Sequence, residues 1–521
     1  MTYLGKIPAL PERSAWRPRE IFANRPLAPE RANFSASWTR GLLWPLAGIF
    51  LLGMAAQIYW GVNTDTSWNI TLAEKVLDGE RPYVDFIEIN PPLSFFLYMP
   101  PTLIARLSGT TPEFMVDLFC FAGAALSLWL SGIILARGGG AGVDARLGLV
   151  AAAVLILLPA RTFDEREHIA LIACLPCLAG LAVLAAGGRV ALFEGVLAGV
   201  GAGLAFSIKP YFVLFALPVL LDLTRRQGWR ALVVRGELYA ALATMALYWA
   251  AVAVFIPAFF EHAAPMVRDI YLPVRRPLTE FFSDPTILIW LSLAAVLTFA
   301  ARRRLAEPFV ATLTLSSVGA IAAYLVQGKL WPYQGYPAVA LIALALGALL
   351  LGAPKPREGR SARRRVAVAA ISTLLLTLAG FWFAVRADRP ELERAVAAIS
   401  PHPKVLVIGS DIALGHPLTR HVRGQWVGSR FSLWITDMSS HALARGASGD
   451  EARRDEAYLQ LDRERLVADI DDGKPDAILI ANKLWLAWTK AHPDVAAALA
   501  DYRWRETADG IMVYARNDLA R

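Results

Sequence analysis

The chain has 521 residues, of which 56% are hydrophobic and 18% charged, with a mean hydropathy of +0.44. This composition is too apolar for a soluble globular protein, so it predicts a polytopic membrane protein. The formal net charge is +8, yet residues 386–521 hold 19 Lys and Arg against 20 Asp and Glu. The positive excess therefore lies in the apolar part, where basic loops set membrane orientation, and we expect no nucleic-acid partner.

The first 40 residues are polar and basic, and the first apolar run begins too late for a cleavable signal peptide. We therefore expect residues 1–41 to be a cytoplasmic tail and residues 42–385 to form a transmembrane domain. The three cysteines lie inside apolar runs, which does not favour a disulfide framework. Eleven apolar runs predict spans, at roughly 42–60, 112–136, 147–160, 169–187, 191–207, 210–222, 237–257, 286–300, 308–326, 337–352 and 366–385.

One further apolar segment, residues 93–107, is predicted not to cross the membrane. If it crossed, the basic stretches 224–235, 301–305 and 354–365 would all lie outside, against the positive-inside rule. The pair Pro100-Pro101 at its centre also removes helix hydrogen bonds that lipid cannot replace. We therefore expect the N-terminus to lie inside, and the first outer loop 61–111 and everything after residue 386 to lie outside.

Residues 386–521 change in character and predict a small α/β domain. The segments 404–410, 475–481 and 510–516 are short β-type runs, and residues 451–469 have a helical pattern. The fold class expected from the sequence is thus a polytopic α-helical membrane protein, with about eleven spans and a small C-terminal α/β domain outside the membrane.

The first outer loop places an acidic residue, Asp65, just after the first span. Residues 66–78 carry apolar side chains at helical spacing, which predicts an amphipathic helix lying on the bilayer surface. Asp65 would then lie where lipid headgroups meet water. A purely structural role, as the N-cap of that helix, is an equally open interpretation.

A dense ionisable cluster opens the fourth span, in the stretch RTFDEREH (161–168). Asp164, Glu165, Arg166, Glu167 and His168 would lie at the outer edge of the membrane, where charges are costly unless they face a polar cavity. A cavity shared with Asp65 would give an acidic pair suited to removing a proton from a hydroxyl. An interfacial salt-bridge cluster is the alternative.

Cations also occur on the predicted outer side, against the orientation rule, at Lys209, Arg275, Arg276 and Lys329. Each therefore calls for an anionic partner, and for Lys209, in a tight turn before Pro210, we favour a dedicated phosphate site over contact with lipid headgroups.

Aromatic and amide side chains follow in the outer turn GKLWPYQGYP (328–337). An interfacial aromatic belt explains the rings of Trp331 and Tyr333, but not the neighbouring amide of Gln334. Sugar rings, with apolar faces and hydroxyl edges, would fit such a surface.

Together these features resemble the GT-C superfamily of membrane glycosyltransferases, which use polyprenyl-phosphate-linked sugars. The resemblance rests on Asp65 shortly after the first span, on the pattern LDGERPYVDFIEINPPL (77–93), on Glu167 and His168 opening a later span, and on the turn GKLWPYQGYP. It covers most of residues 42–386 in layout, and a C-terminal extramembrane domain also occurs in that superfamily.

The resemblance implies an inverting transferase at the outer face of a bacterial cytoplasmic membrane, with a polyprenyl-phosphate sugar as donor and a glycan, lipid or protein as acceptor. It implies that Asp65 is the catalytic base and that a residue of the 164–168 group assists it. A divalent metal is possible, and no other cofactor is expected. The implied donor-phosphate ligands are Lys209, Arg166, Arg275, Arg276 and Lys329. The implied sugar- or acceptor-binding residues are Asp85, Glu88, Tyr211, Trp331, Tyr333 and Gln334.

Two rival functions remain open at this point. A lipid-linked glycan transporter or flippase would be expected to show internal repeats and broken helices at the membrane centre, and we find no repeat. A polysaccharide polymerase would share the lipid-linked donor, but commonly has a larger late loop than residues 258–285.

Overall fold

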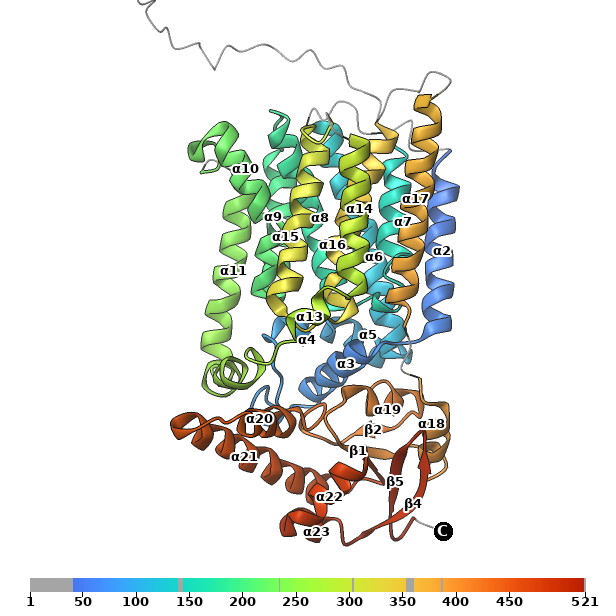
Figure 1. Ribbon diagram of the computed structural model, residues 1–521, viewed down its shortest axis with the longest axis vertical. Helices are drawn as coiled ribbons and strands as arrows, with labels where there is room; N and C mark the ends of the chain where they lie inside the picture. The colour runs from blue at the N-terminus through green and yellow to red at the C-terminus, as the bar shows by residue number, and fades with distance from the viewer. Residues whose placement is uncertain are drawn as a thin grey trace, which may run out of the picture.

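A computed structural model describes residues 41–138, 144–233, 235–301, 304–352, 360–385 and 388–519. It consists of a bundle of long, roughly parallel helices with a small domain of mixed secondary structure at one end (Figure 1). The fold class expected from the sequence is thereby confirmed. The predicted tail lies, except for residue 41, outside the described residues.

The bundle is built from the apolar runs that the sequence predicts as spans. Seven helices of the described chain are long and apolar enough to cross a membrane: α2 (Leu43–Trp60), α6 (Pro112–Arg137), α8 (Arg166–Ala185), α11 (Gly236–Phe255), α15 (Pro308–Gln327), α16 (Pro332–Leu351) and α17 (Arg360–Phe383). Shorter apolar helices complete the bundle: α7 (Leu147–Ile156), α9 (Leu192–Ile208) and α14 (Pro285–Ala301), with η2 (Pro210–Phe215) running into α10 (Leu217–Gln227). Helices α8 and α16 lie at its centre, since most of their residues are buried.

Small residues allow α9 and α11 to pack closely. A Cβ atom added at Gly199 would come within 2.2 Å of the Glu237 carbonyl oxygen, and one at Gly203 within 2.6 Å of Thr244 Cβ. Side chains at these positions would push the two helices apart.

Short helices occupy the end of the bundle that carries the C-terminal domain: α3 (Thr64–Leu77), α4 (Leu93–Phe96), α5 (Met99–Ser108), α12 (Ala264–Met266) and α13 (Leu278–Phe281). Helix α5 packs beside α3 and does not cross the bundle (Figure 1), as expected for residues 93–107.

The expectation of a surface helix at residues 66–78 is only half correct. A helix forms there, but α3 lies between the bundle and the C-terminal domain, and every residue from Thr66 to Ala73 is buried. Its apolar residues Trp68 and Leu72 pack in one cluster with side chains of the C-terminal domain. The amphipathic pattern therefore reflects packing against protein and not against lipid.

The C-terminal domain contains a five-stranded sheet of order β2-β1-β3-β5-β4. Strands β1 (Lys404–Ile408), β3 (Ala477–Ile480) and β5 (Ile511–Arg516) match the expected runs, whereas β2 (Gln425–Trp426) and β4 (Tyr502–Ala508) were not expected. Strands β2, β1 and β3 are parallel, and β5 and β4 are antiparallel additions. The helices of this domain are α18 (Pro390–Ala397), α19 (Leu418–His421), α20 (Trp434–Ala444), α21 (Gly449–Gly473), α22 (Lys483–Ala491) and α23 (Pro493–Ala498).

Candidate active site

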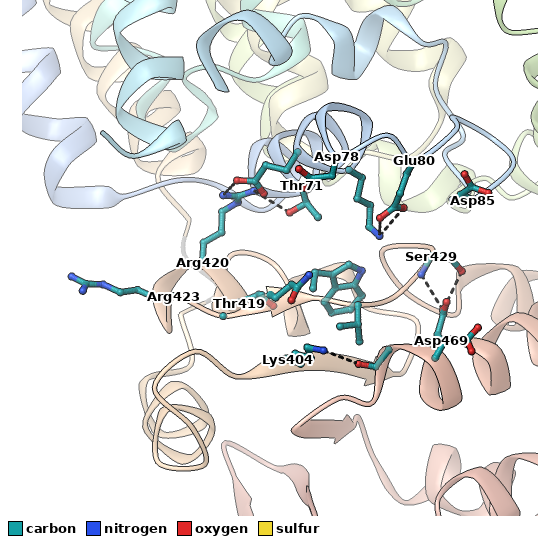
Figure 2. Close-up of a pocket in the computed structure, with 18 of the residues that line it drawn as sticks. Thr71, Asp78, Glu80, Asp85, Lys404, Thr419, Arg420, Arg423, Ser429 and Asp469 are labelled. Carbon is teal, nitrogen blue, oxygen red and sulfur yellow. Dashed lines mark hydrogen bonds and ion pairs between the residues drawn. The ribbon is translucent and has the colours of Figure 1, made fainter. Parts of the chain in front are cut away.

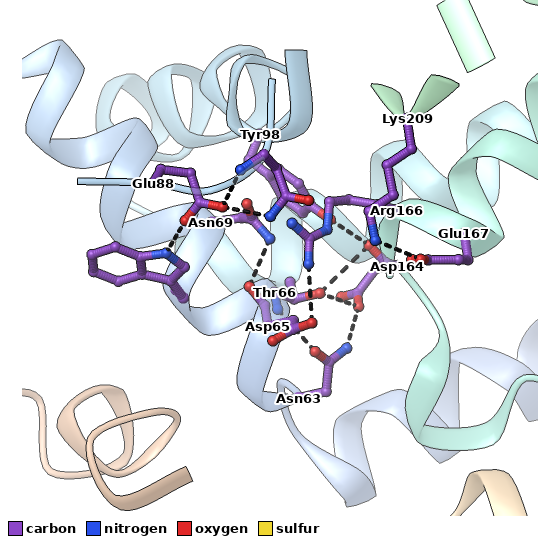
Figure 3. A network of polar contacts seen from close by, with 12 residues as sticks. Asn63, Asp65, Thr66, Asn69, Glu88, Tyr98, Asp164, Arg166, Glu167 and Lys209 are labelled. Carbon is purple, nitrogen blue, oxygen red and sulfur yellow. Dashed lines mark hydrogen bonds and ion pairs between the residues drawn. The ribbon is translucent and has the colours of Figure 1, made fainter. Parts of the chain in front are cut away.

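A cavity of about 630 Å³ lies where the bundle, α3 and the C-terminal domain meet. Asp65 of α3, Arg166 at the start of α8 and Lys209 after α9 all line it. The three segments are far apart in the sequence, and the fold brings them together around one cavity. Figure 3 shows the polar network that surrounds them.

Asp65 is not the N-cap of α3. Asn63 has that role, because its Oδ1 accepts a hydrogen bond from the backbone N–H of Thr66 at 2.8 Å. The Asp65 carboxylate is therefore free to face the cavity, where its Oδ2 accepts from Arg166 Nη2 at 3.0 Å. The Asp65 side chain remains 16% exposed, so a bound molecule can reach it.

Arg166 and Lys209 lie on the bundle side of the cavity. Lys209 donates from Nζ to Glu167 Oε1 at 2.7 Å, and the Glu167 side chain is completely buried. Burial lowers the pKa of the Lys209 ammonium group, while the charge of Glu167 opposes that shift. A Lys has three N–H donors and an Arg has five, so both Lys209 and Arg166 keep donors for an anion.

Glu165 was expected only as one member of the 164–168 group, without a role of its own. It immediately precedes α8, lines the cavity and is 3% exposed. Burial raises the pKa of its carboxyl well above the usual value, and the nearby charge of Asp65 raises it further. Its position in the acidic stretch 164–167 was the only signal, and this could not say which acid faces the cavity.

Asp164 and His168 are buried beside the cavity and do not line it. Asp164 Oδ1 accepts hydrogen bonds from Asn63 Nδ2 and Thr66 Oγ1, both at 2.8 Å, so it holds the first turn of α3. His168 packs against Phe163 with ring centroids 4.8 Å apart, and its Nε2 lies 2.8 Å from a backbone carbonyl oxygen. The structure thus gives both side chains positions suited to holding the fold.

Several buried polar atoms around the cavity have no hydrogen-bond partner among the residues that the structure describes. They include Glu165 Oε2, Arg166 Nε, Tyr333 Oη and Trp434 Nε1, and all four residues line the cavity. Buried polar groups are almost always paired in native proteins. Their concentration here indicates that a polar ligand or water completes the site.

Of the remaining predicted residues, Glu88, Arg276, Trp331 and Tyr333 line the cavity. Glu88 Oε2 accepts from Trp68 Nε1 at 2.6 Å, which fixes the indole at the cavity wall.

The other predicted ligands, Asp85, Tyr211, Arg275, Lys329 and Gln334, are not among the lining residues. Asp85 pairs with Arg81 at 2.7 Å, and this partner lowers the pKa of the Asp85 carboxyl to about 2. Lys329 donates to the carbonyl oxygen of Tyr271 at 2.6 Å and to that of Val274, and lies over the Tyr271 ring. The charged groups of Asp85 and Lys329 thus contact other groups of the protein.

The C-terminal domain forms the remaining wall of the cavity, which the sequence analysis did not anticipate. Residues 410–413 follow β1, and Phe431, Trp434, Asp437 and Met438 follow β2. Both segments come after the carboxyl ends of parallel strands, the edge where open α/β sheets bind ligands. The rings of Phe431 and Trp434 stack with centroids 6.1 Å apart and an interplanar angle of 14°. This wall offers aromatic faces and carboxylates, in contrast to the cations opposite.

Within the described part of the chain, no group of three or more His, Cys, Asp or Glu side chains is arranged to hold a metal ion. The possible metal therefore stays a prediction.

Comparisons with known proteins identify similar structures but no similar sequences. No protein-family model matches the chain, and no curated protein does. Two solved structures of ArnT from Cupriavidus metallidurans match it, one bound to undecaprenyl phosphate and one in the apo state. They have TM-scores of 0.57 and 0.56, each with 14% sequence identity. The first match covers 91% of this chain and 98% of ArnT, and the second 94% and 99%.

A weaker likeness connects the chain to an Archaeoglobus fulgidus oligosaccharyltransferase, with a TM-score of 0.45, 14% identity, and coverage of 91% of this chain and 73% of the other. At 14% identity the match to ArnT shows the fold alone. The chain is a multi-span membrane protein with the fold of the GT-C glycosyltransferase superfamily that its sequence resembles.

Proposed function

We propose that the chain is an inverting glycosyltransferase that moves a sugar from a polyprenyl-phosphate-linked donor to an acceptor hydroxyl. The observation that carries the proposal is one cavity that holds the Asp65 carboxylate beside the cations Arg166 and Lys209. The fold shared with ArnT, which has been solved with undecaprenyl phosphate, supports a lipid phosphate as part of the donor.

In the proposed reaction the carboxylate acts as a base and the two cations stabilise the leaving phosphate. The carboxylate of Asp65 takes the proton of the acceptor hydroxyl, and the oxygen attacks the anomeric carbon of the donor sugar. The bond between that carbon and the phosphate oxygen breaks, and the polyprenyl phosphate leaves with the bonding electrons. Arg166 and Lys209 stabilise the negative charge that develops on the phosphate. Attack from the side opposite the leaving group inverts the anomeric configuration.

The remaining cavity residues would hold the sugars. Trp331 and Tyr333 from the bundle, and Phe431 and Trp434 from the C-terminal domain, offer aromatic faces to sugar rings. Burial raises the pKa of the Glu165 carboxyl well above its usual value and so favours the protonated form, which can donate a hydrogen bond to a sugar oxygen.

The proposed orientation places the cavity and the C-terminal domain on the outer side of the membrane, away from the cytoplasm. It rests on the basic stretches at the opposite ends of the helices, such as 224–235 after α10. Single cysteines at the exposed positions 228 and 484 test it, because the native cysteines are buried. A membrane-impermeant thiol reagent added to intact cells should label position 484 only, and labelling of position 228 alone would reverse the orientation.

The catalytic assignment is tested by Asp65→Asn, assayed in liposomes with undecaprenyl-phosphate-linked radioactive hexoses and pentoses. We expect sugar transfer to be abolished while the protein folds normally. Asp78→Asn is the matched control, since Asp78 ends the same helix, pairs with the exposed Arg106 and does not line the cavity. Full activity in Asp65→Asn would overturn the assignment. Movement of the intact donor across the bilayer without transfer would instead support a transporter.

A further inference from the structure

Helix α3, which carries Asp65, is contacted on the side opposite the bundle by Arg420 of the C-terminal domain. Arg420 lies in α19, in the wall of an open cleft of about 800 Å³ between that domain and α3 (Figure 2). Only 11% of its side chain is exposed. Its contacts therefore form within the protein and are little weakened by solvent.

The guanidinium group of Arg420 reaches three successive turns of α3. Its Nε donates to the backbone carbonyl of Ser67 at 3.2 Å, and Nη2 donates to Thr71 Oγ1 at 3.1 Å and to Glu74 Oε2 at 2.6 Å. Its Nη1 donates to Glu113 Oε1, at the start of α6, at 2.9 Å. Residues 67, 71 and 74 form one stripe of the helix, so Arg420 constrains the rotation of α3 about its axis.

A second residue of the same segment supports this contact. His416 Nδ1 lies 3.2 Å from Ser67 Oγ, and its ring packs against Trp68 and Trp426. Burial lowers the pKa of His416 to about 3, and the charge of Arg420 contributes to the shift. The imidazole therefore stays neutral and does not repel the guanidinium group.

The bundle holds the other end of the helix. Asn63 and Thr66, which flank Asp65, both donate to Asp164, as described above. The first turn of α3 is thus fixed by the bundle, and the turns that follow are fixed by the C-terminal domain. Asp65 lies in the first turn, between Asn63 and Thr66, and the turns that Arg420 contacts follow it directly.

We propose that Arg420 is a positioning residue for transfer, which holds α3 in the rotation that presents Asp65 to Arg166 and to the cavity. The proposal rests on the proposed function, because it assigns Arg420 an effect through Asp65. Arg420 itself does not line the cavity. A lysine cannot replace it, since one ammonium group cannot reach a backbone carbonyl, a hydroxyl and two carboxylates with fixed fork geometry.

The test compares three variants of the full-length protein: Arg420→Lys, Glu74→Gln and Glu113→Gln. Turnover is measured with the undecaprenyl-phosphate sugar that the wild type uses, and affinity is measured with radiolabelled undecaprenyl phosphate alone. A displacement of about 1 Å at a reacting group can cost about 100-fold in rate, so we expect Arg420→Lys and Glu74→Gln to lower turnover by about 10- to 100-fold. Affinity for undecaprenyl phosphate should not change, because Arg166 and Lys209 remain in place.

Glu113→Gln is the matched control. It alters a carboxylate that contacts the same guanidinium group at a similar distance, but on α6 and not on α3. It should retain wild-type turnover. Equal losses in Glu74→Gln and Glu113→Gln would show that Arg420 supports only the general fold, and full turnover in Arg420→Lys would also overturn the proposal.

Hydrogen exchange of the backbone amides of residues 66–74 separates this proposal from the proposed function. If the wild type transfers no sugar from any undecaprenyl-phosphate donor, the proposed function fails, and the exchange experiment still decides whether Arg420 constrains α3. Faster exchange in Arg420→Lys and Glu74→Gln, but not in Glu113→Gln, would support the constraint. Unchanged exchange in all three would overturn it.

Discussion

Replacing Lys209 by methionine tests two roles of this residue: stabilising the fold through its ion pair with Glu167, and binding the donor phosphate. Lys209 Nζ lies 2.7 Å from Glu167 Oε1, and the Glu167 side chain is fully buried. At an effective dielectric constant of about 20, their Coulomb attraction is about 6 kcal/mol before desolvation is considered. Removing one member of a buried pair costs about 3–5 kcal/mol, because the other charge is left without compensation. We therefore expect a large loss of stability in Lys209→Met.

The double variant Lys209→Met/Glu167→Gln separates stability from binding. It removes the uncompensated carboxylate, so most of the lost stability should return. Affinity for undecaprenyl phosphate should not return, because a hydrogen bond to a charged group, worth about 1.5–3 kcal/mol, is still missing. That energy corresponds to about 10- to 100-fold weaker binding.

Two measurements on detergent-purified protein check this prediction. Thermal unfolding, followed by tryptophan fluorescence, should rank the wild type and the double variant above the single variant. Binding of radiolabelled undecaprenyl phosphate should be weak in both variants. A double variant that is no more stable than the single one, or that binds undecaprenyl phosphate as tightly as the wild type, would contradict this prediction.

Three other substitutions give separate outcomes. At pH values above about 4.5, Glu165→Gln should have a higher unfolding temperature than the wild type. Burial raises the pKa of Glu165, so the wild type loses stability as pH rises and the unfolded chain releases that proton. A variant with the same pH dependence as the wild type would contradict the buried acid. His416→Gln should flatten the loss of stability that the wild type shows as pH falls from 6.5 towards about 3, where the unfolded chain binds a proton that the folded protein excludes. Comparison of the two pH profiles checks this. Lys329→Met should lower the unfolding temperature, because the carbonyl groups of Tyr271 and Val274 lose their donor; an unchanged temperature would mean that these bonds contribute nothing.

The sequence was sufficient to predict the bundle and the position of Asp65. Long apolar runs have few alternatives to membrane helices, and the positive-inside rule correctly kept residues 93–107 out of the bundle. Asp65 was identified because it follows the first span directly. Its competing role as an N-cap could only be settled by the structure, which gives the cap to Asn63.

The orientation of individual acids in the cluster 164–168 could not be predicted. Adjacent residues at the start of a helix point in different directions, and only the packed fold shows that Glu165 and Arg166 face the cavity while Glu167 faces Lys209. His168 was plausible as a functional group from its type alone, yet it packs inside the bundle.

The contribution of the C-terminal domain to the cavity could also not be predicted from the sequence. Phe431 and Trp434 look like ordinary core residues in a short loop, and their role depends on how the domain sits against the bundle. The same holds for Arg420, whose partners on α3 are more than 300 residues away in the chain. Long-range contacts of this kind leave no periodic pattern in one sequence.

A structure of the protein with bound undecaprenyl phosphate tests the central claim most directly. We predict that the phosphate lies in the cavity within hydrogen-bond distance of Arg166 and Lys209, on the side of Asp65. A phosphate bound elsewhere on the bundle, with Arg166 still paired only to Asp65, would contradict the account.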